Sequence, residues 1–149
     1  MSAASRASRL HRAGPDDIDV LLPLIAEFCA ADDHPYDAAR LDRALPPLLD
    51  SDAYGVVWLV GDGPAGYAVI TWSYSLESGG PDALLDEFYL RERRTGLGSR
   101  VLAAILDDLR TRGIPRIFLE TEAANAAARR FYARHGFVTE QSVWMCADL

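Results

Sequence analysis

A glycine turn between two expected regular elements is the clearest chemical feature of the sequence. The run Arg93-Arg94-Thr95-Gly96-Leu97-Gly98-Ser99 follows a strand pattern and opens a helix pattern. Glycines let the backbone turn sharply and approach a ligand closely. The first amides of a helix have no intrahelical partner and carry the positive end of the helix dipole. Together these features favour an anion cradle suited to a pyrophosphate.

A Gly-x-Gly pair alone is weak evidence, because a plain tight turn that begins a helix is the commoner explanation. The better-known phosphate motifs do not fit this turn either. A Rossmann fingerprint requires a third glycine where Val101 stands. A P-loop requires Gly-Lys-Ser/Thr, which the sequence lacks. Both of these motifs are therefore excluded.

The first half of the chain must supply two helices and a hairpin around this turn. Helical spacing runs from Ile18 to Phe28, where Pro23 should kink or split the helix, and again from Leu41 to Leu48. The segments Val56–Val60 and Gly66–Leu76 are rich in aromatic and β-branched residues and flank Gly-Asp-Gly-Pro. They are predicted to form an antiparallel hairpin.

The second half predicts a strand–turn–helix–strand unit. A strand over Ala83–Leu90 precedes the glycine turn, a helix ends before Gly113, and a second strand covers Arg116–Thr121. Such a crossover makes the two strands parallel. A helix from Asn125 to Gly136 and a last strand over Phe137–Ala147 follow. We expect an α/β fold in one domain over residues 1–149, with a mixed, mostly antiparallel twisted sheet, helices on both faces and disorder in residues 1–7.

The charge and composition of the chain indicate which classes of partner it is suited to bind. The chain of 149 residues carries 15 basic and 22 acidic residues, a formal net charge of −7. An acidic surface disfavours nucleic acid and suits a cationic small molecule. Apolar runs are too short for a membrane span and the N-terminus lacks a secretory core, so we expect a cytoplasmic protein with no membrane partner. The cysteines and histidines show no metal-ligand spacing, so we expect no bound metal and assign no role to the histidines. The two cysteines are predicted to be reduced thiols that are mostly buried. The cysteines and histidines in question are Cys29, Cys146, His11, His34 and His135.

Two sequence blocks resemble the GCN5-related N-acetyltransferase (GNAT) family. That family's cofactor motif, Arg/Gln-x-x-Gly-x-Gly/Ala, is matched by Arg93, Gly96 and Gly98. The segment 125–137, Asn-Ala-Ala-Ala-Arg-Arg-Phe-Tyr-Ala-Arg-His-Gly-Phe, is similar to the family's Asn-x-x-Ala-x-x-Phe-Tyr-x-x-x-Gly-Phe signature. The order of elements also agrees over most of the chain. Two departures stand out: Arg94 occupies a position where the family usually has glycine, and the stretch between the strand end and the motif arginine is about two residues short.

The resemblance implies acetyl-CoA as the acetyl donor, bound where the two parallel strands splay apart. The pantetheine arm would follow the first of these strands, and the pyrophosphate would lie on the amides of the glycine turn. Asn125 would contact the pantetheine arm, and Tyr132, two helical turns further on, would lie beside the thioester sulfur. The implied cofactor-binding residues are Phe88, Tyr89, Leu90, Arg93, Arg94, Thr95, Gly96, Leu97, Gly98, Ser99, Asn125 and Tyr132.

The implied reaction needs a base, an oxyanion donor and an acid. Deprotonating an amine of pKa ~10.4 at pH 7 costs roughly 4–5 kcal/mol, and Asp86 and Glu87 are candidate bases for this step. These two side chains should point to opposite faces of the strand unless a bulge intervenes. A backbone amide near Tyr89 or Leu90 would stabilise the oxyanion. The Tyr132 phenol would protonate the departing thiolate, although an ordinary core aromatic would also suit this position.

The acceptor is less well defined by the sequence. The segment Asp86–Leu90 is similar to one in diamine acetyltransferases, and with the net charge it favours a small cationic amine. The acidic loop Asp32–Asp37 could contact such an amine or could simply be solvated, and Trp58, Trp72 and Tyr74 could wall the acceptor pocket or belong to the core. A protein N-terminal or lysine acetyltransferase, or a non-catalytic acyl-CoA-binding module, are the alternatives. A homodimer paired through the last strand is compatible with the sequence but not required by it.

Overall fold

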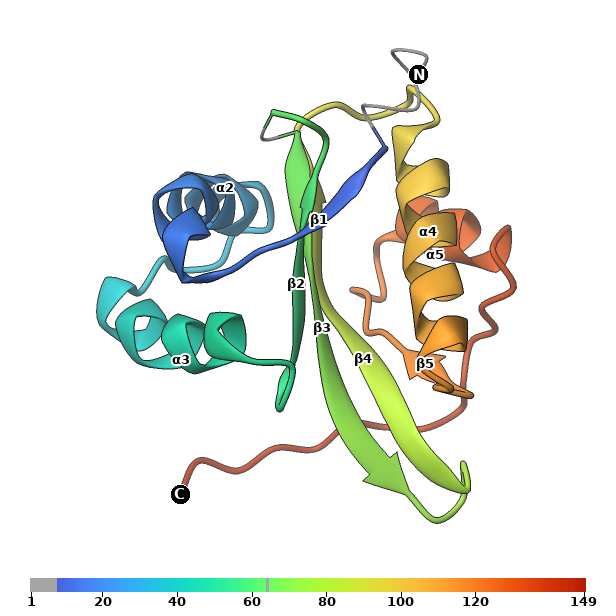
Figure 1. The fold of residues 1–149 in the computed structure, drawn as a ribbon. Coiled ribbons are helices and arrows are strands. Elements are labelled where there is room, and N and C mark those ends of the chain that lie inside the picture. Colours follow the sequence, from blue (N-terminus) through green and yellow to red (C-terminus); the bar gives the residue numbers. More distant parts are fainter. Residues whose placement is uncertain (1–7, 64) are drawn as a thin grey trace.

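The computed structural model describes residues 8–63 and 65–149, so the disorder expected for residues 1–7 lies outside the described residues. The described residues form a five-stranded sheet with helices on both faces (Figure 1). The strands lie in the order β1-β2-β3-β4-β5, and only the β4–β5 pair is parallel. This confirms the mixed, mostly antiparallel sheet. The strands are β1 (Leu10–Arg12), β2 (Gly55–Val60), β3 (Gly66–Ser75), β4 (Gly80–Leu90) and β5 (Ile117–Phe118).

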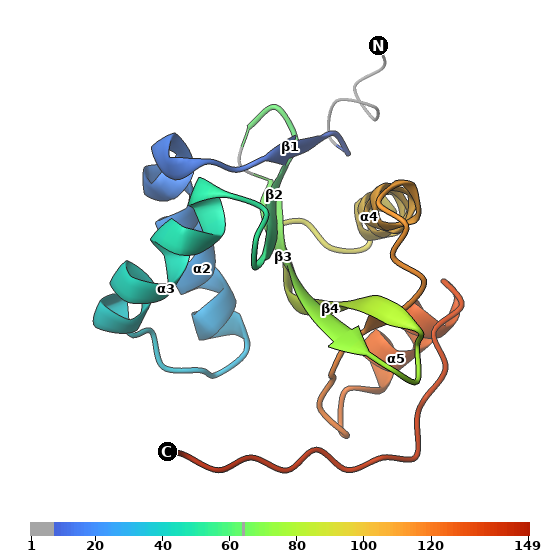
Figure 2. The same cartoon turned by 60° about the horizontal axis from the view of Figure 1, so that its bottom comes forward.

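Two helices cover each face of the sheet, as Figures 1 and 2 show. A 3-10 turn, η1 (Pro15–Asp17), leads into α2, and α2 and α3 lie on one face while α4 and α5 lie on the other. The helices are α2 (Ile18–Ala31), α3 (Ala38–Asp50), α4 (Leu97–Thr111) and α5 (Ala126–Ala133). No helix in the described part of the chain has the length and apolar character needed to cross a bilayer.

Pro23 does not split α2, which continues as one helix from Ile18 to Ala31. An internal proline costs about 3 kcal/mol through a lost hydrogen bond and a steric clash. Leu21, Leu24 and Ile25 flank it and are almost fully buried. Each such side chain contributes roughly 1.5–3 kcal/mol on burial, which outweighs the cost of the proline.

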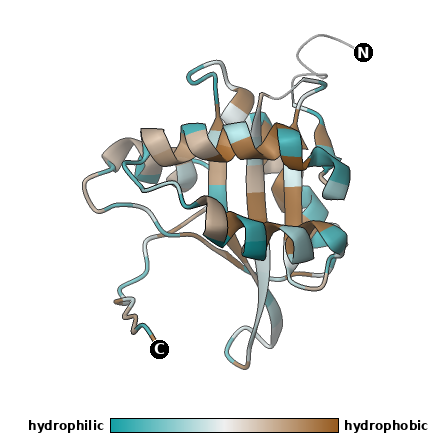
Figure 3. Cartoon of the chain, turned by 90° about the vertical axis from the view of Figure 1, so that its left-hand side faces the viewer, coloured by the Kyte–Doolittle hydropathy of each residue, from teal (hydrophilic) through white to brown (hydrophobic). Residues whose placement is uncertain are grey.

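Apolar side chains form one cluster on each side of the sheet. The strands behind α2 and α3 are coloured as hydrophobic over their central parts in Figure 3. Alternate residues of β2, β3 and β4 supply the two clusters, as the period of a strand requires. Buried residues of the α2/α3 cluster include Leu21, Leu24, Leu49, Val57 and Tyr67, and those of the α4 cluster include Val56, Ile70, Leu85, Val101 and Ile105.

Of the two strands predicted near the C-terminus, one forms over part of its expected length and the other does not form. The strand expected over Arg116–Thr121 is reduced to Ile117–Phe118, and the last strand, expected over Phe137–Ala147, does not form. Residues 138–149 form no regular structure; Glu140 pairs with Arg116 beside β5, and the chain beyond it extends past the sheet to the C-terminus (Figure 1). Cys146 lies in this segment and is exposed, which also contradicts its expected burial, whereas Cys29 is half-buried. A strand needs a hydrogen-bonding partner, and neither segment has one along its full expected length.

Candidate active site

The parallel strands β4 and β5 separate soon after they meet. They pair only through Ala83 with Ile117 and through Leu84 with Phe118. Beyond Leu84, β4 continues to Leu90 along β3, and its other edge has no strand partner within the described residues. This opening places the backbone of Phe88–Leu90 at a free sheet edge, where an extended ligand could pair with it.

A β-bulge in β4 brings the two candidate carboxylates into one neighbourhood. Val69 is opposite Glu87 and Ile70 is opposite Leu85, so Asp86 is the extra residue. Leu85 and Phe88 consequently both pack in the α4 cluster, although strict alternation would place them on opposite faces. The bulge removes the alternation that would have separated Asp86 from Glu87, and the charge of Asp86 acts directly on Glu87.

Glu87 is held on the α2 side of the sheet by a buried tyrosine. The Tyr67 hydroxyl donates a hydrogen bond of 2.8 Å to Glu87 Oε2, and Tyr67 is fully buried. Burial raises the pKa of Glu87, and the nearby Asp86 carboxylate raises it further, while the Tyr67 hydrogen bond and His34 oppose the change. A carboxylate whose pKa lies above its usual range is better matched to general-base work near neutral pH.

Asp86 is a weaker candidate for the base. Its side chain is exposed at the bulge, although the surrounding chain desolvates it enough to raise its pKa. No described hydrogen bond or ion pair orients its carboxylate. Of the two predicted bases, Glu87 is therefore the one whose position is fixed.

An ion-pair clamp ties α2 to the end of β4 beside Glu87. Glu27 accepts hydrogen bonds from the Tyr89 hydroxyl at 3.2 Å and from Arg91 Nε at 2.9 Å, and Arg91 Nη2 lies 2.6 Å from Glu27 Oε1. The rings of Phe28, Tyr67 and Tyr89 pack next to it, with centroids 6.3–6.4 Å apart. No pattern in the sequence indicates this cluster, because it forms only through the register that sets Tyr67 opposite Tyr89.

The glycine turn has the geometry expected of an anion cradle. Gly96 is the N-cap of α4 with a left-handed φ of 76°, and no side chain caps the helix there. The Leu97 amide reaches Thr95 Oγ1 at 3.4 Å, so the amides of Gly98 and Ser99 are the ones left for a ligand. Residues 91–96 are exposed, and no carboxylate in the described part of the chain pairs with Arg93 or Arg94.

Arg94 adopts the conformation of the glycine that it replaces, with φ of 65°. A left-handed residue other than glycine costs roughly 1–2 kcal/mol. Because glycine adds entropy to the unfolded chain, we expect Arg94→Gly to raise the free energy of unfolding by a net amount of about 0.5–1 kcal/mol. Urea denaturation measures this change. Arg94→Ala is the control, since it also removes the charge but keeps the strain; an equal gain in both variants would contradict the explanation.

Two contacts fix α5 against the first turn of α4. A Cβ on Gly98 would lie 3.4 Å from the Phe131 ring, a van der Waals distance, so the first turn of α4 packs directly against α5. Ser99 Oγ is 3.0 Å from His135 Nε2, and the His135 ring packs 5.1 Å from that of Phe131. His135 was expected to have no role, and no spacing in the sequence indicates its contact with the cradle.

Asn125 and Tyr132 both belong to α5. Asn125 is its exposed N-cap and accepts a hydrogen bond of 3.0 Å from the Ala128 amide, which leaves the side-chain nitrogen able to donate. Tyr132 packs between Phe131 and Phe137, with ring centroids 5.1 Å and 5.5 Å away. Burial raises the pKa of Tyr132 to about 12, so its phenol stays protonated at neutral pH. Tyr132 lies on the α4 side of the sheet and Glu87 on the α2 side.

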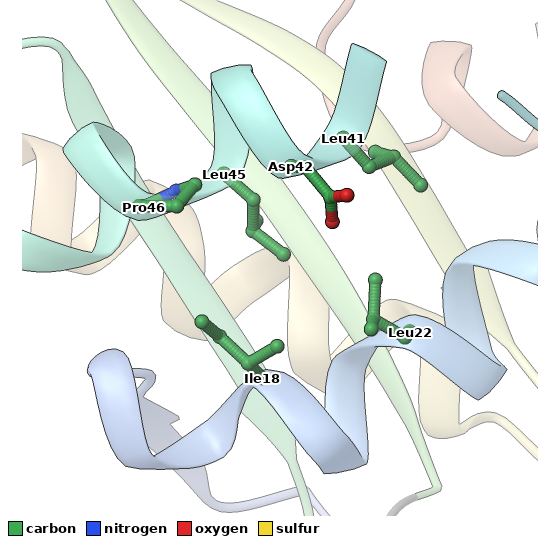
Figure 4. Close-up of a pocket in the computed structure, with 6 residues that line it drawn as sticks. All are labelled: Ile18, Leu22, Leu41, Asp42, Leu45 and Pro46. Atoms are coloured by element: carbon green, nitrogen blue, oxygen red, sulfur yellow. The ribbon is translucent and has the colours of Figure 1, made fainter. Parts of the chain in front are cut away.

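Other features flagged in the sequence lie away from this opening or serve the fold. Trp72 donates to the Asp52 carbonyl at 2.8 Å and lies under Arg112, Trp58 packs against the core, and Tyr74 is exposed. Within the described ranges no three potential ligands gather as a metal site would require. A recess between α2 and α3 (Figure 4) shares no residue with the predicted site; Ile18, Leu22, Leu41, Asp42, Leu45 and Pro46 line it.

Comparison with known proteins agrees with this geometry. The model of the acetyltransferase (GNAT) family matches residues 21–137. The chain belongs to this family. A [ribosomal protein bS18]-alanine N-acetyltransferase of Salmonella typhimurium is 44% identical over 45 residues, a stretch that spans only 30% of each protein.

Solved structures of the same fold cover nearly the whole chain. An integron cassette protein from the mobile metagenome of Cole Harbour Salt Marsh superposes with a TM-score of 0.84 at 26% identity, covering 100% of this GNAT protein and 96% of the other. A candidate acetyltransferase from Arthrobacter sp. FB24 gives a TM-score of 0.82 at 31% identity, covering 95% and 96% of the two chains. These matches confirm the fold expected from the two sequence blocks.

Proposed function

We propose that this GNAT protein transfers the acetyl group of acetyl-CoA to a primary amine, with Glu87 as the general base. One observation carries the proposal. A half-buried carboxylate of raised pKa, that of Glu87, is held by Tyr67 beside the sheet edge that leads into the N-terminus of α4. A non-catalytic binding module would need the cradle but would have no use for such a carboxylate.

The cradle residues suit the donor's phosphates and arm. The amides of Gly98 and Ser99 together with Arg93 and Arg94 would bind the pyrophosphate. The free edge of β4 over Phe88–Leu90 would pair with the pantetheine amides, and the side-chain nitrogen of Asn125 would donate to the same arm. The thioester would then lie in the opening, with Glu87 approaching from one face of the sheet and Tyr132 from the other.

The proposed reaction is a direct attack without a covalent enzyme intermediate. Glu87 takes a proton from the amine, directly or through a water molecule, and the amine nitrogen bonds to the thioester carbonyl carbon. A backbone amide near Tyr89 or Leu90 donates to the resulting oxyanion. The carbon–sulfur bond then breaks, the nitrogen releases its second proton to water to give the neutral amide, and the thiolate accepts a hydrogen bond from the Tyr132 phenol as it leaves.

The acceptor we favour is a small cationic amine. Asp86 and the acidic residues of the Asp32–Asp37 loop lie on or near the Glu87 side, where His34 acts on Glu87 electrostatically. Carboxylates next to a base hold a polyamine-like cation and orient its terminal amine. The Salmonella relative is a [ribosomal protein bS18]-alanine N-acetyltransferase, so a protein N-terminus is the second candidate acceptor. Release of free thiol with polyamines, and separately with peptides of free N-terminus, discriminates between the two.

Calorimetric titration of the full chain with acetyl-CoA tests the donor site. We expect micromolar binding to the unaltered protein and a loss of at least about tenfold for Gly96→Glu, which places a negative charge over the cradle. Gly96→Ala is the matched control, since both variants share the strain of a side chain at φ of 76°. No binding to the unaltered protein would contradict the donor assignment, and equal losses in both variants would show that charge at the cradle is irrelevant.

A further inference from the structure

A side-chain contact joins the end of α5 to the first turn of α4. His135 Nε2 lies 3.0 Å from Ser99 Oγ, although 36 positions separate the two residues in the sequence. Both side chains are partly buried, and both helices lie on the same face of the sheet (Figure 1). Ser99 belongs to the proposed pyrophosphate cradle, whereas no step of the proposed reaction uses His135.

The turn that ends α5 fixes the position of His135. The His135 amide donates to the Tyr132 carbonyl at 2.9 Å, and Gly136 follows with the left-handed φ of 87° that closes such a turn. The imidazole packs against the Phe131 ring, with centroids 5.1 Å apart. The backbone and the ring of His135 are therefore both restrained, with Nε2 directed at Ser99.

Ser99 offers two polar groups to an anion at the cradle. The Arg100 amide donates to the Gly96 carbonyl at 3.3 Å and begins the hydrogen-bonded part of α4. The Ser99 amide precedes this bond and has no partner within the helix. The Ser99 hydroxyl branches from the same Cα, so an anionic oxygen bound to the amide also lies within reach of Oγ. Ser99 is thus able to hold a phosphate oxygen through its backbone and its side chain together.

The direction of the hydrogen bond between His135 and Ser99 decides whether the hydroxyl can bind an anion. A hydroxyl carries one proton, and a neutral imidazole carries one N–H, on either Nδ1 or Nε2. If Ser99 donates to a bare Nε2, its proton is used and only lone pairs face the cradle, where they repel a phosphate. If Nε2 carries the proton and donates to Oγ, the hydroxyl proton is left for the ligand.

We propose that His135 is a positioning residue for the acetyl donor: its Nε2–H donates to Ser99 Oγ, which leaves the Ser99 hydroxyl proton to bind a pyrophosphate oxygen. This role rests on the proposed acetyl-CoA site and adds to it a residue that lies outside the glycine turn. Hydrogen bonds in such a chain polarise one another, so the hydroxyl binds an anion more strongly than an isolated serine does. Because Tyr132 precedes His135 by three residues, the same contact ties the proposed acid to the helix that holds the phosphates.

Two substitutions at His135 give opposite results for a donor role and for a packing role. His135→Gln keeps a side-chain N–H close to the position of Nε2 but removes the ring, whereas His135→Phe keeps a ring against Phe131 but removes the N–H. In calorimetric titrations with acetyl-CoA, we expect Kd to change by less than about threefold for His135→Gln and to rise roughly tenfold for His135→Phe, the loss of one hydrogen bond to an anion. The reverse order of the two variants would show a packing role and overturn the proposal.

The dependence on Ser99 is measured with a double-mutant cycle. Ser99→Ala should also weaken acetyl-CoA binding roughly tenfold, and adding His135→Phe to it should cost less than about twofold more, because both residues act through one hydrogen-bond chain. A further tenfold loss in the double variant would show that His135 acts without Ser99 and would overturn the proposal. If the unaltered protein does not bind acetyl-CoA, the proposed donor site fails as well; binding that is insensitive to His135 and Ser99 overturns the His135 role alone.

A donor without phosphates separates this role from general damage to the site. S-acetylpantetheine lacks the pyrophosphate, so kcat/KM with this donor should be the same for His135→Phe and the unaltered protein, and an equal loss with both donors would contradict the proposal. Nitrogen-15 NMR of the unaltered protein gives a readout even if a variant fails to fold. With acetyl-CoA bound, His135 should carry a proton on Nε2, with or without a second one on Nδ1. A proton on Nδ1 alone would mean that Ser99 donates to the imidazole, which overturns the proposal.

Discussion

Glu87→Gln is expected to lower kcat/KM for the amine by roughly 10²–10⁴-fold, the usual contribution of a general base. The glutamine carbonyl still accepts the hydrogen bond from Tyr67 but cannot take a proton from the acceptor. Affinity for acetyl-CoA should stay the same, because the cradle lies at the other end of the opening. Thiol release measures the first quantity and calorimetry the second.

The pH dependence of kcat/KM distinguishes Glu87 from Asp86 as the general base. A base acts when ionised, so kcat/KM should rise with pH through the raised pKa of Glu87. Tyr67→Phe removes a contact that lowers this pKa, so the rising limb should move to higher pH. Glu87→Gln should abolish that limb, whereas Asp86→Asn should retain it and cost less than about tenfold. If the rise of kcat/KM with pH disappears in Asp86→Asn but not in Glu87→Gln, then Asp86 is the general base.

Glu87→Gln should not achieve its effect by unfolding the protein. A carboxylate whose pKa is raised in the folded state favours folding at low pH, and this benefit fades as the pH rises from the unfolded toward the folded pKa. Above both values the ionised Glu87 is a net cost to stability. A neutral glutamine removes that cost, so the melting temperature at neutral pH should be equal or higher. A lower melting temperature would mean that the loss of activity has a structural cause.

The sequence was sufficient where local signals and chain order agree. The cradle follows from glycines at Gly96 and Gly98 between a strand and a helix, and the structure places it at the N-terminus of α4 with the left-handed φ that such a turn needs. The parallel pair follows from the crossover rule. Both are properties of consecutive residues, and no distant contact is needed to define them.

The surroundings of Glu87 depend on register, which the sequence does not display. Without the bulge at Asp86, one of the two candidate carboxylates would face away from the other, and no residue within Leu85–Phe88 indicates that a bulge forms there. Tyr67 and Glu27 come from other elements and reach the site only because β3 and α2 pack as they do. The strand predicted over Phe137–Ala147 does not form, because no strand in the described part of the chain pairs with this segment.

Tyr132→Phe is expected to lower kcat by about 10–100-fold, an effect at the low end of the range for proton donors. The reason lies in two pKa values. Burial raises that of Tyr132 to about 12, whereas a thiol ordinarily has a pKa of about 8.5. Full proton transfer to the departing sulfur is therefore uphill, and the phenol contributes mainly a hydrogen bond to the developing thiolate. Acetyl-CoA affinity should change by less than about twofold, since the thioester sulfur is a poor acceptor before cleavage.

The leaving group tests this role of Tyr132 independently of its packing. Phenylalanine keeps the ring contacts with Phe131 and Phe137, so the melting temperature should not change. With an acetyl thioester of an acidic aryl thiol, whose thiolate leaves without help, the difference between Tyr132→Phe and the unaltered protein should shrink toward zero. An equal loss with both donors would make Tyr132 a positioning residue, because a group that only packs the site cannot distinguish one departing sulfur from another.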